Sequence, residues 1–96
     1  IFACNDEMAA GVLFAARERG LSVPGDLSIV GFDDTPIAAR VWPPLTTVRW
    51  PIVAMGRSAA LKLISGTIAH AEEVSEPSLF ISTLIRRGSV APPRKD

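Results

Sequence analysis

The chain has 96 residues, of which 48% are hydrophobic and 21% are charged, a composition typical of one globular domain with a modest core. Ten basic and ten acidic residues cancel, which argues against a nucleic-acid or anionic-lipid surface on this segment. No stretch is long and apolar enough to span a membrane. The one cysteine, Cys4, cannot form an internal disulfide and is expected to be a buried, inert thiol. These features favour a cytoplasmic protein, and the start inside an apolar run suggests a segment of a longer one.

Two apolar runs end in polar side chains. Residues 1–4 lead into Asn5, and residues 27–32 lead into Asp33. Short apolar runs of this kind are typical of strands buried on both faces of a parallel sheet, and the stretch between them has the length of a βαβ crossover. Because parallel strands point the same way, Asn5 and Asp33 are expected side by side at the carboxyl edge, where open α/β sheets bind ligands. An amide beside a carboxylate suits hydroxyl groups, so the pattern points first to a sugar or another polyol.

A helix is predicted from Asn5 or Asp6 to about Arg19, with Gly20 in the left-handed position beyond its end. Its middle, residues 8–16, carries no charged or polar side chain, and that apolar surface is wider than one sheet can cover. A second covering surface is therefore expected, either another lobe or another subunit. Ala10, Phe14 and Arg17 are spaced to face it.

The remaining elements follow from turn residues and periodicity. Residues 23–26 predict a type II turn with a positive φ at Gly25. A short helix through Ala39, a strand over 45–50, a helix from Pro51 to about Gly66, a solvated loop over 67–77 and a strand over 79–85 are predicted in that order.

Three strings in this order and spacing carry a resemblance to a known family. They are N-D-E-M-A-A-G at 5–11, V-P-G-D-L-S-I-V-G-F-D-D at 23–34 and P-P-L-T-T-V at 43–48. The chain resembles the C-terminal part of the effector-binding core of LacI/GalR-type bacterial transcriptional repressors, from Ile1 to about Pro93. The first string alone is weak, because periplasmic sugar-binding proteins are similar there; the other two are more specific to the repressors.

The resemblance implies an α/β, parallel-sheet, two-lobed fold of the periplasmic-binding-protein type (type I), present as its C-terminal portion. Residues 1–49 and 84–93 would belong mainly to one lobe and 50–83 to the other, with 94–96 as a tail. A small-molecule effector, a sugar foremost, would bind between the lobes and control operator affinity in a homodimer. Operator DNA would be read by a helix-turn-helix that this chain lacks.

The resemblance also implies roles for individual residues. The ligand-contacting asparagine and aspartate of the family fall on Asn5 and Asp33, and two ligand-lining positions fall on Trp50 and Ile52. Helix capping is the alternative for Asn5, and packing is the alternative for Trp50. The subunit interface maps to the first helix and to the segment 38–42, through Ala10, Leu13, Phe14, Arg17 and Val41.

No chemistry of catalysis is indicated. Asp33 and Asp34 are adjacent on an extended chain and point apart, so they do not form an acid/base pair; Asp34 and Asp6 are interpreted as structural. His70 has no second ligand at metal spacing, and Arg86 with Arg87 is interpreted as a solvated strand end. No cofactor, metal or membrane partner is expected. The rival hypotheses are a secreted sugar-binding transport protein and an α/β enzyme.

Overall fold

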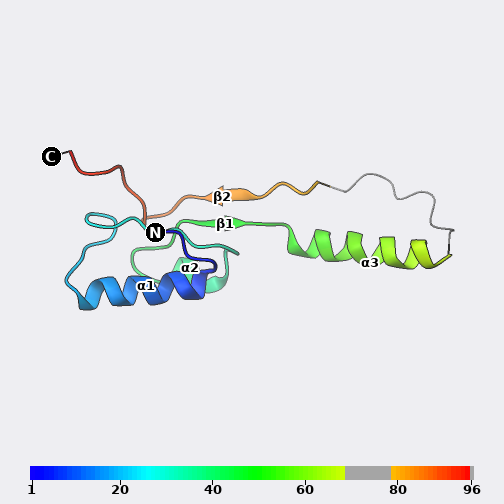
Figure 1. The fold of residues 1–96 in the computed structure, drawn as a ribbon, viewed down its shortest axis with the longest axis horizontal. Helices are drawn as coiled ribbons and strands as arrows, with labels where there is room; N and C mark the ends of the chain where they lie inside the picture. The colour runs from blue at the N-terminus through cyan, green and yellow to red at the C-terminus, as the bar shows by residue number, and fades with distance from the viewer. Residues whose placement is uncertain (69–78, 96) are drawn as a thin grey trace. The chain divides into compact units, whose positions relative to one another are not determined.

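The computed structural model describes residues 1–68 and 79–95, and the chain divides into two compact units. Unit 1 combines Ile1–Arg49 with Thr83–Asp96, and unit 2 is Trp50–Ser82. Unit 1 contains the helices α1 (Asp6–Glu18) and α2 (Pro36–Arg40) and the strands β1 (Thr47–Arg49) and β2 (Thr83–Ile85), whereas unit 2 contains the helix α3 (Ile52–Ile68) (Figure 1). The unit boundaries lie within one residue of the predicted lobe crossings; their assignment to two lobes stays a prediction.

The sequence signals at both ends of α1 are confirmed. The Asn5 side chain accepts a 2.8 Å hydrogen bond from the Met8 amide, which satisfies one of the free N–H groups of the first turn. At the other end Gly20 has φ +70°, and the amides of Gly20 and Leu21 donate to the carbonyls of Arg17 and Ala16. This pair of bonds is the Schellman arrangement, which requires a left-handed residue that glycine adopts without strain.

The two faces of α1 differ in what covers them. Ala9, Leu13 and Ala16 are buried on the inner face, while Met8 and Phe14 are 57% and 64% exposed. The predicted excess of apolar surface is therefore present on this helix. Leu13 lies on the wrong face for the predicted subunit interface, because the i, i+4, i+7 spacing that it shares with Ala9 and Ala16 turns it into the chain's own core.

The extended segments of unit 1 pair in parallel, as predicted for residues 1–4 and 27–32. Phe2 bridges Val30, and Val30 bridges Thr46, both in the parallel sense. The segment around Val30 therefore lies between the other two. Thr46 leads directly into β1, which pairs with β2 in the antiparallel sense, with Arg49 opposite Thr83 (Figure 1).

The strands are shorter than the sequence predicts. Residues 1–4 and 27–32 form single bridges rather than strands. On the side of residues 27–32 that faces Thr46 the pairing partner changes: the Gly31 amide donates to the Thr46 carbonyl, whereas the Ile29 amide, two residues earlier, donates to the Ser89 carbonyl. The expected burial of residues 1–4 on both faces is also wrong. Ala3 is buried, whereas Phe2 and Cys4 are exposed, since alternate residues of an extended chain face opposite sides and α1 covers one of them.

The core of unit 1 is small and is closed by a serine. Ile29 and Leu45 are its largest fully buried apolar side chains. Ser89, also fully buried, accepts from the Thr46 amide at 2.8 Å and donates to the Ile29 carbonyl at 2.5 Å. One hydroxyl thereby links the Thr46 amide to the Ile29 carbonyl, next to the bridge between Val30 and Thr46.

Two further predictions are corrected. The turn at residues 23–26 exists, but Gly25 has no positive φ; the turn is closed by the Ser22 carbonyl, which accepts from the Asp26 amide, and by the Asp26 carboxylate, which accepts from Ser22. In unit 2, α3 continues through Ile68, two residues beyond Gly66, so it takes in the start of the predicted loop. The rest of that loop, with His70, lies outside the described residues. Among those described, no helix is long and apolar enough to cross a membrane.

Candidate functional site at the ends of the parallel segments

Asn5 and Asp33 lie at matching positions on neighbouring parallel segments. The bridge joins Phe2 to Val30, so each polar residue follows the bridge by three positions. A backbone bond from the Ala3 amide to the Val30 carbonyl, 2.8 Å long, continues this register. The predicted juxtaposition of the two residues at the carboxyl edge of unit 1 rests on this register and stays a prediction.

The Asn5 side chain caps α1, which is the alternative role predicted for it. Its oxygen caps α1 through the Met8 amide. An amide has donors as well as an acceptor, and the cap uses Oδ1 alone, without the Nδ2 donors. Helix capping and ligand contact are therefore compatible roles for Asn5.

Asp33 has an unusual backbone conformation. Asp33 has φ 104° and Asp34 has φ 55°, and they are the two residues other than glycine with positive φ in the described chain. Such conformations cost free energy for residues with a Cβ and persist where surrounding contacts hold them. The Asp33 amide donates to the Val48 carbonyl at 2.9 Å, which ties this turn to β1.

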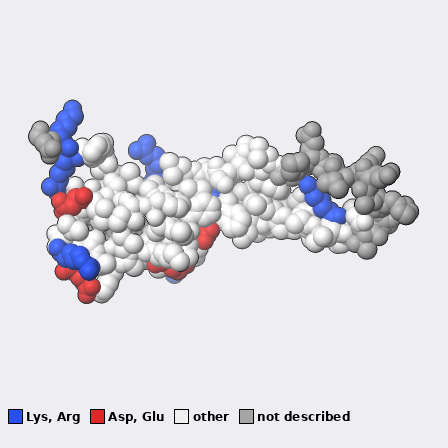
Figure 2. All heavy atoms as spheres, in the orientation of Figure 1, with Lys and Arg blue, Asp and Glu red and all other residues white. Residues whose placement is uncertain are grey.

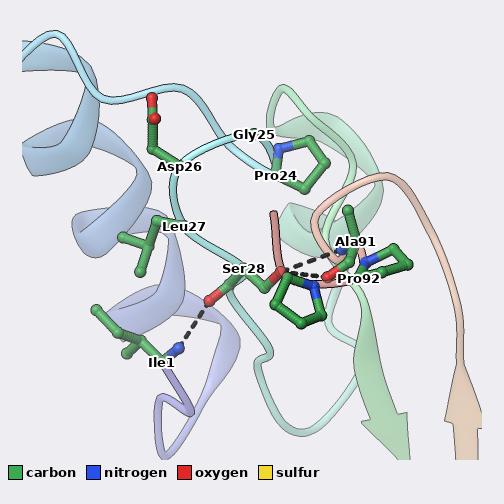
Figure 3. Close-up of a pocket in the computed structure, with 9 residues that line it drawn as sticks. Ile1, Pro24, Gly25, Asp26, Leu27, Ser28, Ala91 and Pro92 are labelled. Atoms are coloured by element: carbon green, nitrogen blue, oxygen red, sulfur yellow. Dashed lines mark hydrogen bonds between the residues drawn. The ribbon is translucent and has the colours of Figure 1, made fainter. Parts of the chain in front are cut away.

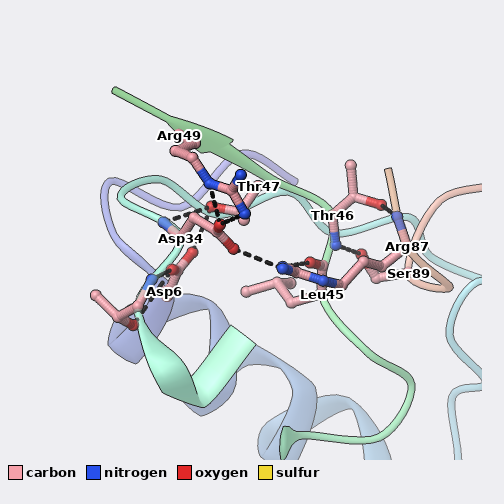
Figure 4. Close-up of polar contacts among 9 residues, drawn as sticks. Asp6, Asp34, Leu45, Thr46, Thr47, Arg49, Arg87 and Ser89 are labelled. Atoms are coloured by element: carbon pink, nitrogen blue, oxygen red, sulfur yellow. Dashed lines mark hydrogen bonds and ion pairs between the residues drawn. The ribbon is translucent and has the colours of Figure 1, made fainter. Parts of the chain in front are cut away.

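The Asp34 carboxylate, only 6% exposed, is the centre of a charged network. Its Oδ2 accepts from Nε of Arg49 at 2.7 Å, and its Oδ1 accepts from Arg87 at 2.7 Å (Figure 4). Burial raises the pKa of Asp34, but the hydrogen bonds and charges of Arg87 and Arg49 outweigh burial and hold that pKa below its ordinary value of 3.8. Asp34 is therefore structural, as predicted.

A second buried carboxylate lies beneath the same turn. Asp6, fully buried, accepts from the Thr47 hydroxyl at 2.6 Å and from the Thr35 amide at 2.7 Å (Figure 4). These bonds join the first turn of α1 to β1 and to the residue that precedes α2. Its predicted structural role is confirmed.

Sequence reasoning missed the two arginines. Arg87 was expected on a solvated strand end, but its side chain is 20% exposed and also donates to the Leu45 carbonyl at 3.0 Å. Arg86 is exposed, as predicted. Arg49 was predicted only as a crossing point. The partners of Arg87 are far away in the sequence, so no local pattern marks it.

The remaining predicted site residues lie on other segments of units 1 and 2. Trp50 and Ile52 belong to unit 2, at the start of α3. Ala10 is half-buried, Phe14 and Arg17 are exposed, and Val41 packs partly against the core of unit 1. Their predicted contacts with a ligand or a second subunit stay predictions. No group of three or more potential metal ligands occurs within residues 1–68 and 79–95.

A pocket of about 360 Å³ in unit 1 does not include any predicted ligand contact. It is lined by Ile1, residues 24–28 and residues 91–93 (Figure 3), at the beginning of the segment that Asp33 ends. The Ser28 hydroxyl in its wall exchanges hydrogen bonds with the Ala91 backbone. On the face drawn in Figure 2, acidic and basic side chains of unit 1 are interspersed, in keeping with the zero net charge.

Comparisons with known proteins agree with the sequence resemblance. Residues 1–90 match the model of the periplasmic binding protein-like domain. The HTH-type transcriptional regulator GalS of Salmonella typhimurium is 46% identical over 94 residues, which are 95% of this chain and 26% of that protein. The chain thus spans about a quarter of the length of this curated relative.

Solved structures give the same result. A LacI family regulator of Enterococcus faecium with bound ribose matches 97% of this chain and 34% of its own, with a TM-score of 0.81 and 34% identity. The lac repressor dimer bound to operator and an anti-inducer matches 95% of this chain and 31% of its own, with a TM-score of 0.83 and 32% identity. The chain belongs to the periplasmic binding protein-like domain family, as found in transcriptional regulators of the LacI/GalR type.

Proposed function

We propose that this chain is part of the effector-binding domain of a LacI/GalR-type transcriptional regulator, in which a sugar controls the affinity of the full-length protein for operator DNA. The observation that carries the proposal is the shared register of Asn5 and Asp33 beyond the Phe2 to Val30 bridge. A carboxylate that accepts from several hydroxyl groups, beside an amide that donates and accepts, suits a polyol. The ribose bound to the Enterococcus faecium regulator supports a sugar.

Trp50 and Ile52 complete the proposed contacts. An indole face packs well against the C–H face of a sugar ring, and an aliphatic side chain adds apolar surface typical of small-molecule sites. The proposal for these two residues rests on the resemblance to the family. The operator itself would be bound by sequence outside this chain, in a homodimer located in the cytoplasm.

The coupling needs no catalysis. A sugar that binds one conformation of the regulator more tightly than another changes operator affinity by the same factor by which the operator changes sugar affinity. The relatives named above are regulators, which favours this function over transport and over enzymatic turnover of the sugar.

The test is calorimetric titration of the full-length protein with ribose, glucose, sucrose and cellobiose, followed by operator binding with and without each sugar. Asp33→Asn is the sharpest variant, because asparagine tolerates a positive φ better than alanine does, so the change removes the charge with little backbone strain. We expect a loss of about 1.5–3 kcal/mol in sugar affinity, the value of hydrogen bonds to a charged group.

Two further variants complete the design. Asp26→Asn, at the opposite end of the same segment, is the matched control and should leave affinity unchanged. Asn5→Ser retains an oxygen that caps α1 while removing the amide donors, so it separates the two roles of Asn5. Unchanged affinity in a folded Asp33→Asn protein would exclude the site, and sugar binding without any effect on operator affinity would exclude the regulatory function.

A further inference from the structure

The turn that carries Asp33 is held in a conformation that its own residues do not favour. Asp33 and Asp34 both have positive φ, at 104° and 55°. For residues with a side chain, each such conformation costs free energy. Two in succession therefore require contacts from outside the turn, and the identity of those contacts decides how firmly Asp33 is oriented.

Asp34 supplies the strongest of these contacts. Arg49 places Nε and a terminal nitrogen at 2.7 and 2.6 Å from Oδ2, while Arg87 places a terminal nitrogen 2.7 Å from Oδ1 (Figure 4). The backbone of the turn is also held: the Asp33 amide donates to the Val48 carbonyl at 2.9 Å, and the Asp34 amide approaches the Thr47 hydroxyl at 3.4 Å.

The two arginines differ in how they are held. Arg87 is largely buried and is anchored a second time by the Leu45 carbonyl. The Arg49 side chain is 61% exposed, so solvent screens its charge more than that of Arg87. Two arginines, one exposed and one largely buried, thus hold the nearly buried Asp34 carboxylate at the strained turn.

We propose that Asp34 is a positioning residue for the sugar contact of Asp33: held by Arg49 and Arg87, its carboxylate keeps the Asp33–Asp34 turn in the left-handed conformation that presents Asp33 at the edge of unit 1. The inference rests on the proposed function of Asp33. Asp34 acts through its neighbour and makes no sugar contact itself.

The test compares Asp34→Asn with Asp26→Asn in the full-length protein. Asp26 is a matched control because it also accepts from an arginine, Arg94, and lies at the other end of the same segment. Two readouts are taken: calorimetric titration with the same four sugars, and hydrogen exchange by mass spectrometry over residues 31–36. We expect Asp34→Asn to weaken sugar binding at least tenfold and to speed exchange in this peptide at least tenfold, with exchange over α1 unchanged. Asp26→Asn should alter neither readout.

Arg49→Gln provides an independent route if Asp34→Asn does not fold, because an exposed arginine can be replaced with little loss of packing. It should weaken sugar binding about threefold and speed exchange in the same peptide, and Arg49→Lys should restore part of both. Unchanged exchange at the turn, or unchanged sugar affinity despite faster exchange, would overturn the inference. Failure of all four sugars to bind the unaltered protein would count against the proposed function. The exchange rates over residues 31–36 would then still show whether Asp34 holds the turn.

Discussion

The Thr47 hydroxyl donates a 2.6 Å hydrogen bond to the carboxylate of Asp6, 41 positions away in the chain, and both side chains are fully buried. Asp6 opens α1 and Thr47 opens β1, so this bond fixes the helix that follows Asn5 to the strand beside Asp33. A buried carboxylate is costly unless donors surround it. The side chains under the candidate site therefore also determine the stability of unit 1.

Thr47→Val should destabilise the full-length protein by about 1–3 kcal/mol, because valine retains the shape of threonine and leaves a buried carboxylate oxygen without its donor. Denaturant unfolding measures the effect. Thr83→Val, at an exposed position of β2, is the control and should change stability by less than about 0.5 kcal/mol. Equal effects of the two substitutions would mean that the Asp6 bond contributes nothing.

Gly31→Ala should destabilise the protein by at least about 1–3 kcal/mol, the usual cost of overpacking. A Cβ at Gly31 would collide with Oδ1 of Asp6 and lie 2.8 Å from a methyl group of Leu45. Gly66→Ala in α3, where an added Cβ meets nothing within 4 Å in the described chain, should be neutral or stabilising. Thermal unfolding of both variants checks the contrast, and an unaltered midpoint for Gly31→Ala would contradict the close approach of Asp6.

Stability should fall in acid partly through Asp34. Its pKa in the folded protein lies below the ordinary value of 3.8, because the hydrogen bonds and charges of Arg87 and Arg49 outweigh burial. The stabilising contribution is therefore complete above pH 3.8 and is lost as the pH falls through the lower, folded pKa. Asp26 has the same sign, through its bonds with Ser22 and then Arg94. Unfolding free energies measured from pH 6 downward should converge for the unaltered protein and Asp34→Asn, and a constant difference between them would contradict the assignment.

Phe14→Glu should yield monomers if the outer face of α1 is the predicted subunit interface. Phe14 is 64% exposed, and a glutamate buried at such a face would lack a partner. Sedimentation velocity at low micromolar concentration reports the state directly. Arg86→Glu, at an exposed residue outside the predicted interface, should remain dimeric, and a dimer that survives Phe14→Glu would refute the interface.

Local signals predicted the helices well, and the strands poorly. The Asn5 cap and Gly20 delimit α1 to within one residue because both act on the nearest turn of backbone. Strand length depends on partners instead: Ser89 takes the Ile29 amide and ends a ladder that the apolar run alone would extend. Asn5 and Asp33 could be predicted as candidate site residues because each follows an apolar run, and the runs were expected to end at the same edge of a parallel sheet. The ion pairs of Asp34 with Arg49 and Arg87 span 15 and 53 positions, and no pattern within either segment encodes such a separation.

The antiparallel register of β1 and β2 makes unit 2 an insertion with adjoining ends. The chain leaves unit 1 after Arg49 and returns at Thr83, and these two residues are direct partners in the ladder. Two antiparallel partners are what a two-residue turn such as Asn-Gly connects in a β-hairpin. A two-residue turn in place of residues 50–82 would therefore join Arg49 directly to Thr83 while keeping the register of β1 and β2, so that the network around Asp34 would lie in one continuous stretch of chain.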